Sequence, residues 1–413
     1  MSRTPAARGQ APAALGAAGA PGPLAGLRVL DCSAIIAGPI ATAFLATYGA
    51  DVVKLEPLDG DALRGYPSTL PGQSRYFLGI NRGKRSVAVD LKRPEGVALA
   101  RRLARDADVF VESFRPGVAA RLSLDDGTLR SSNPRLIYCS ISAFGQAGPL
   151  AERAGLDPVV QCYGGLAWEQ GAADGSDVPV LVRGSLVDYY TGSLAASGIL
   201  LAVIARAKTG VGQRLDTSLL DGVLAMQAGR AFWAEALEPP EAVVDLLGDR
   251  VSRIYPAKDG YVYVYVELPK FWTGLCRALG LEAWLDDPRL QTMVGRHTHK
   301  AELIAAITER LATRPAVEWE TVFELADVPC TRIRTIPEML LDPQALANGT
   351  LATVTHPALG PVRALATPVR LKDTPGRLPA PPPALGEHTD AVLAEAGYSS
   401  GEIARLRAAG VVR

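Results

Sequence analysis

The first half of the chain alternates short apolar runs with helical segments, and this alternation constrains the fold more than any other feature. Helical segments such as 41–48 and 94–106 fall between most of the runs. Such alternation is typical of an open, mostly parallel α/β sheet. The expected strands are 27–31, 51–55, 86–91, 108–112 and 135–141.

Ligands in an open parallel sheet bind beyond the carboxyl ends of the strands. Three segments rich in small or polar residues follow the expected strands, at 31–39, 56–57 and 113–117. We therefore expect the functional site at this edge of the sheet.

The rest of the chain indicates a second, smaller domain. A chain of 413 residues is long enough for two domains. Two long helices are expected before this domain, at 191–206 and 219–236. The second domain begins at about residue 249 and contains a strand at 261–266 and an amphipathic helix at 300–312. A short helix at 400–409 is expected to begin with a Ser399/Glu402 capping box.

The fold class predicted from these elements is α/β, with a Rossmann-like large domain and a smaller α+β domain. The tail is rich in Ala, Pro and Gly, which predicts disorder. The expected parts are a disordered tail at 1–22, the N-terminal part of the large domain at 23–225, a linker at 226–248, the small domain at 249–330, and a segment at 331–413 that returns to the large domain.

Composition excludes several classes of function. The 43 basic and 43 acidic residues balance, so nothing indicates binding to nucleic acid or to an anionic membrane. No apolar run approaches the roughly 20 residues of a membrane span, and the run at 194–205 is too short. The five cysteines show neither a CxxC pair nor a zinc-binding spacing, which predicts reduced thiols, no metal site and a cytoplasmic location. All four histidines follow residue 296, so the first domain has no histidine-based chemistry.

Two aspartates stand out as candidates for chemistry. Asp188 lies just before the apolar run at 194–205, and Asp157 lies just before Pro158. A carboxylate at the end of a buried helix is costly unless it is hydrogen-bonded or reactive. Each aspartate has two interpretations: both could be helix N-caps, or Asp188 could be catalytic with Asp157 as its acid/base partner.

The basic segment at 79–86 superficially resembles a phosphate-binding loop. Its glycine spacing is one residue short, and Arg85 stands where such a loop needs Ser or Thr. The charges of Arg82, Lys84 and Arg85 therefore form either a solvated turn or, with Lys92 and Arg121, a cationic patch for a phosphorylated ligand.

An ordered succession of short motifs resembles the family III CoA-transferases, a group that includes formyl-CoA transferases, mesaconyl-CoA transferases and α-methylacyl-CoA racemases. The resemblance runs from about Pro23 to the C-terminus. The matching segments are 24–31, 37–39, 49–54, 81–91, 112–117, 144–149, 209–213 and 385–390.

The resemblance implies a role for individual residues. It places the nucleophilic aspartate of the family on Asp188 and an assisting acidic residue on Asp157. Leu156 stands where the racemases have histidine, and Ile36 stands where some members have glutamine. The glycine-rich loop of formyl-CoA transferase is not visible in the matching segment 246–253. The implied contacts to CoA are Ala37, Val89, Lys92, Ser113, Phe114, Arg121 and Leu122.

The resemblance also implies the reaction and the assembly. The enzyme would transfer CoA from an acyl-CoA to a carboxylic acid through an aspartyl anhydride and an aspartyl-CoA thioester, with CoA as a substrate and no tightly bound cofactor. The fold would be an interlocked-ring homodimer. Arg183, Arg250 or Arg253 could bind a second carboxylate of a dicarboxylate such as succinate, mesaconate or glutarate. The alternatives are a 2-methylacyl-CoA racemase or epimerase, which Leu156 disfavours, and a CoA-ester-binding protein without turnover.

Overall fold

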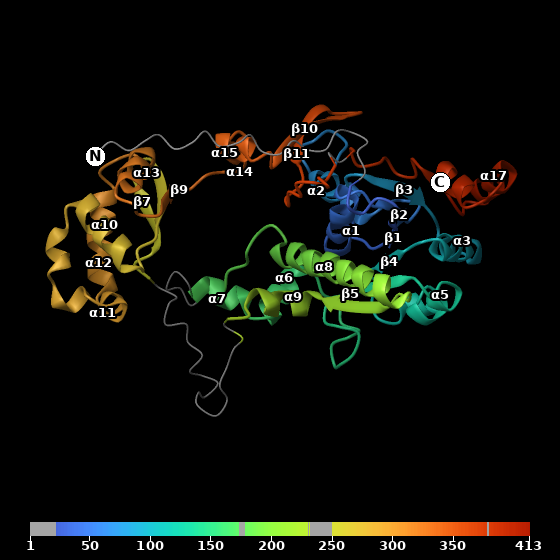
Figure 1. Cartoon of the computed structure of the whole chain (residues 1–413), viewed down its shortest axis with the longest axis horizontal. Coiled ribbons are helices and arrows are strands. Elements are labelled where there is room, and N and C mark those ends of the chain that lie inside the picture. The colour runs from blue at the N-terminus through green and yellow to red at the C-terminus, as the bar shows by residue number, and fades with distance from the viewer. Residues whose placement is uncertain (1–21, 173–177, 230, 232–249, 378–379) are drawn as a thin grey trace. The chain divides into compact units, whose positions relative to one another are not determined.

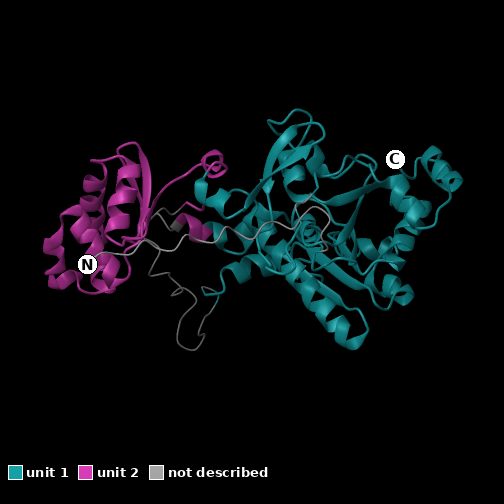
Figure 2. Cartoon of the chain, turned by 45° about the horizontal axis from the view of Figure 1, so that its top comes forward, with its two compact units in different colours: residues 1–167, 181–232, 342–413 teal, residues 168–180, 233–341 magenta. Residues whose placement is uncertain are grey.

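The computed structural model describes residues 22–172, 178–229, 231, 250–377 and 380–413. Almost all of the expected tail at 1–22 and most of the expected linker at 226–248 lie outside these residues. The chain divides into two compact units (Figure 2): unit 1 comprises residues 1–167, 181–232 and 342–413, and unit 2 comprises residues 168–180 and 233–341.

Unit 1 is built around a six-stranded sheet in which every neighbouring pair is parallel (Figure 1). The strand order β3-β2-β1-β4-β5-β6 is that of a doubly wound sheet. This confirms the predicted fold class. The strands are β1 (Arg28–Cys32), β2 (Asp51–Glu56), β3 (Lys84–Ala88), β4 (Val109–Glu112), β5 (Ile137–Ser142) and β6 (Arg214–Ser218).

Sequence reasoning missed β6. Its five residues, Arg-Leu-Asp-Thr-Ser, are mostly polar, because it is an edge strand with partly exposed side chains. Short polar edge strands lack the apolar run by which buried strands are identified.

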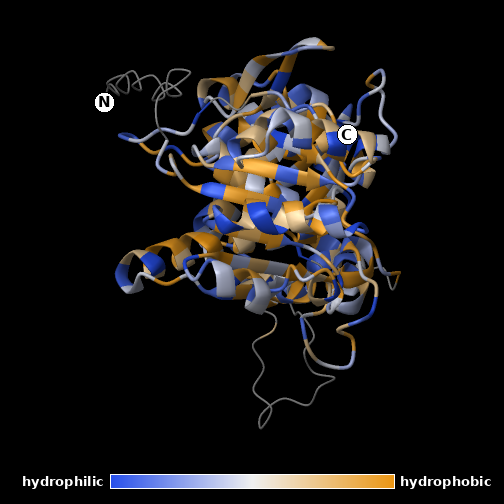
Figure 3. Ribbon diagram, turned by 90° about the vertical axis from the view of Figure 1, so that its right-hand side faces the viewer, coloured by the Kyte–Doolittle hydropathy of each residue, from blue (hydrophilic) through white to orange (hydrophobic). Residues whose placement is uncertain are grey.

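The alternation of side chains along the strands builds one core on each face of the sheet. Val29, Val109 and Ile137 pack on one face with α1, α6, α8 and α9, whereas Leu30 and Phe110 pack on the other with α3, α5, α16 and α17. Figure 3 shows the hydrophobic residues concentrated along the strands of this sheet. The other elements of unit 1 are α1 (Ala37–Thr47), η1 (Ala62–Gly65), α2 (Arg75–Ile80), α3 (Pro94–Arg105), α4 (Val118–Arg121), α5 (Asp126–Ser132), α6 (Asp157–Tyr163), α8 (Leu186–Thr209), α9 (Leu219–Met226), α15 (Pro343–Ala347), the antiparallel pair β10 (Leu351–His356) and β11 (Gly360–Leu365), α16 (Thr389–Glu395) and α17 (Ser400–Ala408).

Helix α8 is longer than expected, since it begins at Leu186 and ends at Thr209. It packs closely on α1 because position 192 is glycine: a Cβ there would lie 1.9 Å from Ile40 Cγ2. Among the described residues, α8 is the one helix long and apolar enough to cross a membrane, but it is partly buried in the core of unit 1, and core helices pass the same test. Its neighbour α9 ends at Met226, and residues 230 and 232–236 of the expected helix lie outside the described residues.

Unit 2 is a small α+β unit with its own core. Its antiparallel strands β7, β8 and β9 pack with three α-helices around Tyr255, Trp272 and Phe323. Helix α7 (Leu166–Ala172) begins in unit 1 and ends in unit 2. The elements of unit 2 are β7 (Arg253–Ala257), β8 (Gly260–Val264), α10 (Pro269–Leu279), η3 (Glu282–Leu285), η4 (Pro288–Leu290), α11 (Met293–Thr298), α12 (Lys300–Leu311), α13 (Ala316–Leu325), β9 (Cys330–Arg332) and α14 (Ile336–Met339).

Candidate active site

Two adjoining pockets lie at the carboxyl edge of the parallel sheet. The Asp188 pocket encloses about 950 Å³ of space, partly open to solvent, and is lined by the loops after β1, β4 and β5, the segment 151–156, Asp188 and Leu219. The β2 pocket encloses about 1540 Å³, also partly open, and is lined by the loops after β1, β2 and β3 together with α4. Ala34 and Phe114 line both pockets. In the strand order, this is the point beside β1 and β4 where a doubly wound sheet binds its ligand.

Asp188 is the third residue of α8, and only 6 % of its surface is exposed. The N-cap of α8 is Ser185, which has φ 57° and whose side chain does not cap the helix. The N-cap interpretation of Asp188 is therefore wrong. The Asp188 backbone N–H instead donates to Oδ2 of Asp157, at 3.0 Å, so a carboxylate 31 residues earlier satisfies the first turn of the helix.

Asp157 is held in place by a second side chain. Its Oδ1 accepts a hydrogen bond from Gln161 Nε2 at 2.6 Å, and Gln161 makes two further hydrogen bonds, each 2.9 Å, to the backbone of Val182. The N-cap of α6 is Leu156, and no hydrogen bond joins the Asp157 carboxylate to a backbone N–H of its own helix among the described residues. The interpretation of Asp157 as the cap of α6 is therefore wrong as well. Asp157 supports α8 and faces Asp188.

The electrostatics around Asp188 keep its carboxyl near the point of titration at neutral pH. Burial is the main cause that raises its pKa from 3.8 to about 7, and the nearby charge of Asp157 adds to the rise. In the described part of the chain no Lys, Arg or His forms an ion pair with Asp188. A buried carboxylate with a strongly perturbed pKa beside a pocket is a candidate for chemistry.

Leu156 lines the Asp188 pocket and is 57 % exposed. Its side chain forms part of the pocket wall and has no group that can exchange a proton. The alternative of a racemase, which needs a second base at this position, gains no support from the geometry.

Most of the residues predicted to contact CoA line one of the two pockets. Phe114 lines both, and Arg121, on α4, lines neither. The Ala34 N–H donates to Ser113 Oγ at 2.9 Å and thereby joins the loops after β1 and β4. Ala37 and Ser113 line the Asp188 pocket, whereas Val89, Lys92 and Leu122 line the β2 pocket.

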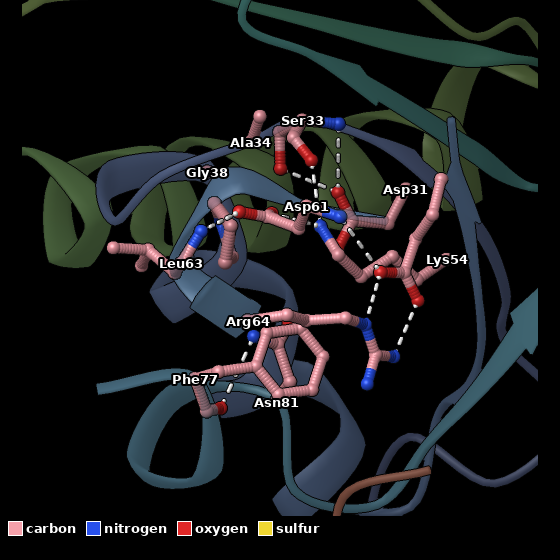
Figure 4. A network of polar contacts seen from close by, with 12 residues as sticks. Asp31, Ser33, Ala34, Gly38, Lys54, Asp61, Leu63, Arg64, Phe77 and Asn81 are labelled. Carbon is pink, nitrogen blue, oxygen red and sulfur yellow. Dashed lines mark hydrogen bonds and ion pairs between the residues drawn. The ribbon is translucent and has the colours of Figure 1, made fainter. Parts of the chain in front are cut away.

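A buried network of charges centred on Asp31 and Lys84 lies beneath the loop after β1 (Figure 4 shows the Asp31 side of it). Lys84 Nζ donates to Asp31 Oδ2 at 2.9 Å, to the Pro39 carbonyl at 2.9 Å and to Asn81 Oδ1 at 2.8 Å. Asp31 also accepts hydrogen bonds from the hydroxyls of Ser33 and Thr42. Asp31 and Lys84 are 0 % and 3 % exposed, so this ion pair is almost fully removed from water.

The network is electrically compensated. Burial alone would raise the pKa of Asp31, but Lys84, Lys54 and the two hydroxyls hold it well below its usual range. Burial lowers the pKa of Lys84 to about 8, yet its three acceptors match the three hydrogens of an ammonium group, so the geometry favours the ion pair at neutral pH.

The same network extends to the floor of the β2 pocket. Lys54 Nζ lies 3.0 Å from Asp61 Oδ2 and donates to the Ser33 carbonyl at 2.7 Å. Arg64 pairs with Glu56 at 2.7 Å. These contacts fix the loops after β1 and β2, which form walls of the two pockets.

The structure corrects both interpretations of the basic segment at 79–86. Lys84 belongs to the buried network, and Arg85 pairs with Asp51 at 2.6 Å and with Glu395 at 2.8 Å. These two residues are neither a solvated turn nor free to bind phosphate. Sequence reasoning missed this because the partners of both residues are distant in the sequence. Arg82, by contrast, is buried without such a partner.

No cluster of three or more His, Cys, Asp or Glu side chains suited to a metal ion occurs within the described ranges.

Residues 24–389 match the model of CoA-transferase family III. The chain is 36 % identical to a succinate–glutarate CoA-transferase from Agrobacterium fabrum, over 90 % of this chain and 95 % of that protein. It is 33 % identical to the human succinyl-CoA:glutarate CoA-transferase, over 94 % and 90 % of the two chains, and 33 % identical to a formyl-CoA:oxalate CoA-transferase from Rhodopseudomonas palustris, over 94 % and 96 %.

The fold of the chain is also similar to that of solved structures. The protein Rv3272 from Mycobacterium tuberculosis superposes with a TM-score of 0.79 at 31 % identity, and the match covers 90 % of this chain and 99 % of that one. A CAIB/BAIF family protein from Brucella suis has the same TM-score and identity, with 91 % and 99 % covered.

Proposed function

Because the chain belongs to CoA-transferase family III and is an enzyme of the CoA-transferase type, we propose that it moves CoA from an acyl-CoA donor to a dicarboxylate acceptor through a covalent intermediate on Asp188. The observation that carries the role of Asp188 is its burial, without a counter-cation among the described residues, at a pocket that adjoins a larger one. The names of the relatives given above, which act on succinate, glutarate or oxalate, support a dicarboxylate as the acceptor.

The proposed reaction has four nucleophilic steps. The Asp188 carboxylate attacks the thioester carbonyl of the acyl-CoA, which forms a mixed anhydride and releases the CoA thiolate. The thiolate attacks the aspartyl carbonyl of the anhydride, which forms an aspartyl-CoA thioester and releases the donor acid. The acceptor carboxylate then attacks this thioester, which gives a second anhydride and frees the thiolate again. The thiolate finally attacks the acyl carbonyl of that anhydride, which yields the new acyl-CoA and regenerates Asp188.

The surroundings of Asp188 suit these steps. An anhydride of a carboxylate retains the transfer potential of a thioester, whereas a serine ester would not, and the anhydride must be kept from water. Burial of Asp188 limits its contact with water and partly desolvates it. Asp157 acts as a positioning residue, because it holds the backbone of Asp188 at 3.0 Å.

We place CoA across both pockets. Val89, Lys92 and Leu122 would contact it in the β2 pocket, and Ala37 and Ser113 in the Asp188 pocket, with the thioester directed to Asp188. Phe114 borders both pockets and would contact CoA at their junction. Arg121 lines neither pocket and would contact the part of CoA that extends beyond them.

Trapping the intermediate tests the proposed function. The protein is incubated with succinyl-CoA, quenched, digested and examined by mass spectrometry. We expect the mass of CoA or of the acyl group on the peptide that carries Asp188, and its replacement by hydroxamate after treatment with hydroxylamine. Transfer of CoA between acids in solution without any adduct on that peptide would contradict the covalent mechanism.

We further propose that the enzyme is an interlocked homodimer. One face of α8 is apolar and exposed in the single chain, with Leu186, Tyr190, Leu201 and Ile204 spaced along it as on one side of a helix. Light scattering should give twice the mass of 43.5 kDa. If the rings are interlocked, tagged and untagged dimers should exchange subunits only after unfolding, whereas free exchange in native buffer would contradict interlocking.

The proposed location is the cytoplasm. All five cysteines are free, which fits a reducing compartment.

A further inference from the structure

Glu112 is a buried carboxylate at the carboxyl edge of the sheet that the proposed reaction does not use. It is the last residue of β4, lies in register between Cys32 of β1 and Ser140 of β5, and is 3 % exposed. No Lys, Arg or His of the described chain forms an ion pair with it; the charge of Arg214 acts on it from beyond ion-pair distance, and Arg214 itself pairs with Asp216. A carboxylate that is buried without such a partner is costly unless hydrogen bonds stabilise it.

Hydrogen bonds to two neighbouring loops take the place of a paired cation. Oε2 of Glu112 accepts from the backbone N–H of Phe114 at 2.7 Å. The carboxyl also forms a hydrogen bond with the hydroxyl of Ser140, and Ser140 Oγ accepts from Gln146 Nε2 at 2.8 Å. Because the Ser140 oxygen accepts from Gln146, its single hydrogen can be donated to Glu112. The carboxylate thus joins the loop after β4 to the loop after β5.

The side chains that meet here come from two of the motifs found in the sequence. Glu112 begins the segment 112–117, and Gln146 lies in the segment 144–149. They meet through Ser140, which belongs to neither motif. None of the three lines either pocket, so any effect that they have on a bound ligand is indirect.

The loop that Glu112 holds forms the junction of the two pockets. Phe114 lines both pockets, and Ser113 lines the Asp188 pocket. Ser113 Oγ accepts from the Ala34 N–H at 2.9 Å, so one residue of the loop is fixed to the loop after β1 and the next residue is fixed to Glu112. A shift of this loop would change both pockets where CoA is proposed to pass from one to the other.

We infer that Glu112 is a positioning residue for acyl-CoA: by binding the Phe114 N–H and the Ser140 hydroxyl, it holds the loops after β4 and β5 in the arrangement that directs the thioester to its nucleophile. This inference rests on the proposed function. Misplacement of a bound substrate by about 1 Å can lower the rate about 100-fold, so a side chain away from the reacting atoms can control the reaction.

Two substitutions of Glu112 test the hydrogen bond to Phe114. Glu112→Met has a similar length but no acceptor for the Phe114 N–H, whereas the amide oxygen of Glu112→Gln accepts from that N–H and its NH₂ group donates to the Ser140 hydroxyl. With succinyl-CoA as donor and glutarate as acceptor, we expect kcat/KM for succinyl-CoA to fall about 100-fold in Glu112→Met and less than about fivefold in Glu112→Gln.

Two substitutions on β5 separate the link between the loops from other contacts of the same carboxyl. Ser140→Ala breaks the connection to Gln146, and we expect kcat/KM to fall about tenfold. Tyr138→Phe is the matched control, because its hydroxyl donates to Glu112 Oε1 at 3.4 Å but belongs to neither loop. We expect kcat/KM of this variant to change less than about twofold.

Two further measurements distinguish positioning from a general loss of structure. Binding of free CoA, measured by calorimetry without turnover, should weaken about tenfold in Glu112→Met. In a Phe114→Ala background, Glu112→Met should lower kcat/KM much less than in the wild type, because the ring that the loop presents to the pockets is already absent. A general loss of structure would lower kcat/KM by the same factor in both backgrounds.

Four outcomes would overturn the inference: wild-type kcat/KM in Glu112→Met, an equal loss in Glu112→Met and Glu112→Gln, the same loss with and without Phe114, or an equal effect of Ser140→Ala and Tyr138→Phe. If Glu112→Met does not fold, the comparison of Ser140→Ala with Tyr138→Phe decides. Failure of the wild type to transfer CoA to any acid would instead contradict the proposed function, and the affinity for free CoA would still report on Glu112.

Discussion

Asp31 and Asp188, both buried at the carboxyl edge of the sheet, have opposite electrostatic surroundings. Asp31, 0 % exposed, is paired with Lys84 and hydrogen-bonded by Ser33 and Thr42, and its pKa is held well below the usual range. Asp188, 6 % exposed, faces a second carboxylate and has a pKa of about 7.

This difference distinguishes buried charges that stabilise the fold from buried charges that react or bind a ligand. A buried charge that is fully paired stays ionised and fixes the backbone around it, as the Asp31 network fixes the loops after β1 and β2. A buried charge that is left without a counter-charge is destabilising, and it persists where it reacts or binds. Asp188 belongs to this second kind.

Substitution of Asp188 by Asn should have the largest effect. We expect turnover to fall about 10⁴-fold or more, because the nucleophile is lost. Stability should move in the opposite direction. The folded pKa of Asp188 lies above its ordinary value, so ionisation costs stability as the pH rises from 3.8 to about 7, and the cost stays constant above pH 7.

Asparagine removes this cost. At pH 8 the unfolding free energy of Asp188→Asn, measured by urea titration, should exceed that of the wild type by up to about 4 kcal/mol, and at pH 4 the two should converge. If Asp188→Asn were inactive and also less stable than the wild type at pH 8, the carboxylate of Asp188 would have a structural role like that of Asp31.

Breaking the compensated pair should cost stability. Lys84→Met leaves the carboxylate of Asp31 buried without its partner, so we expect a loss of about 3–5 kcal/mol in unfolding free energy, with no direct effect on the chemistry. The double variant Asp31→Asn/Lys84→Met should regain part of this loss, because neither member of the pair is then left charged. Independent, additive effects of the two substitutions would contradict the pairing.

Neutralising Asp157 should bring Asp188 closer to an ordinary carboxyl. The acidic limb of the pH profile of kcat/KM should lie near pH 7 in the wild type and move to lower pH in Asp157→Asn, because the charge that raises the pKa of Asp188 is gone. Above pH 8 the rate should fall less than about tenfold, since the asparagine oxygen still accepts the Asp188 N–H and a hydrogen bond is worth about 1 kcal/mol. A limb that does not move would show that Asp157 has no electrostatic influence on Asp188.

The smallest effect is expected one residue after Lys84. Arg85 pairs with Asp51 and Glu395 at the surface, so Arg85→Met should cost about 0–1 kcal/mol and leave the pH profile unchanged. It is the matched control for Lys84→Met, and an equal loss in both variants would remove the distinction between buried and exposed pairs in this segment.

Local sequence predicted those parts of the molecule whose signals are local. Five of the six strands of the parallel sheet follow from their apolar runs, and the Ser399/Glu402 capping box is confirmed at the start of α17. The start of α8 and the edge strand β6 could not be predicted, because the first turn of α8 depends on Asp157 and β6 depends on its pairing with β5.

For the candidate site, the sequence by itself singled out Asp188 and Asp157 as carboxylates beside apolar or helical segments, since residue type and neighbours are enough for that. Only the tertiary structure decided what each buried charge faces. Lys84 meets an aspartate 53 residues away, Asp157 meets the backbone of Asp188 31 residues away, and Arg82 has no partner in the described chain. The physical reason is that the free energy of a buried charge depends on the charges and dipoles within a few ångströms of it, and folding brings these groups together from positions that are far apart in the sequence.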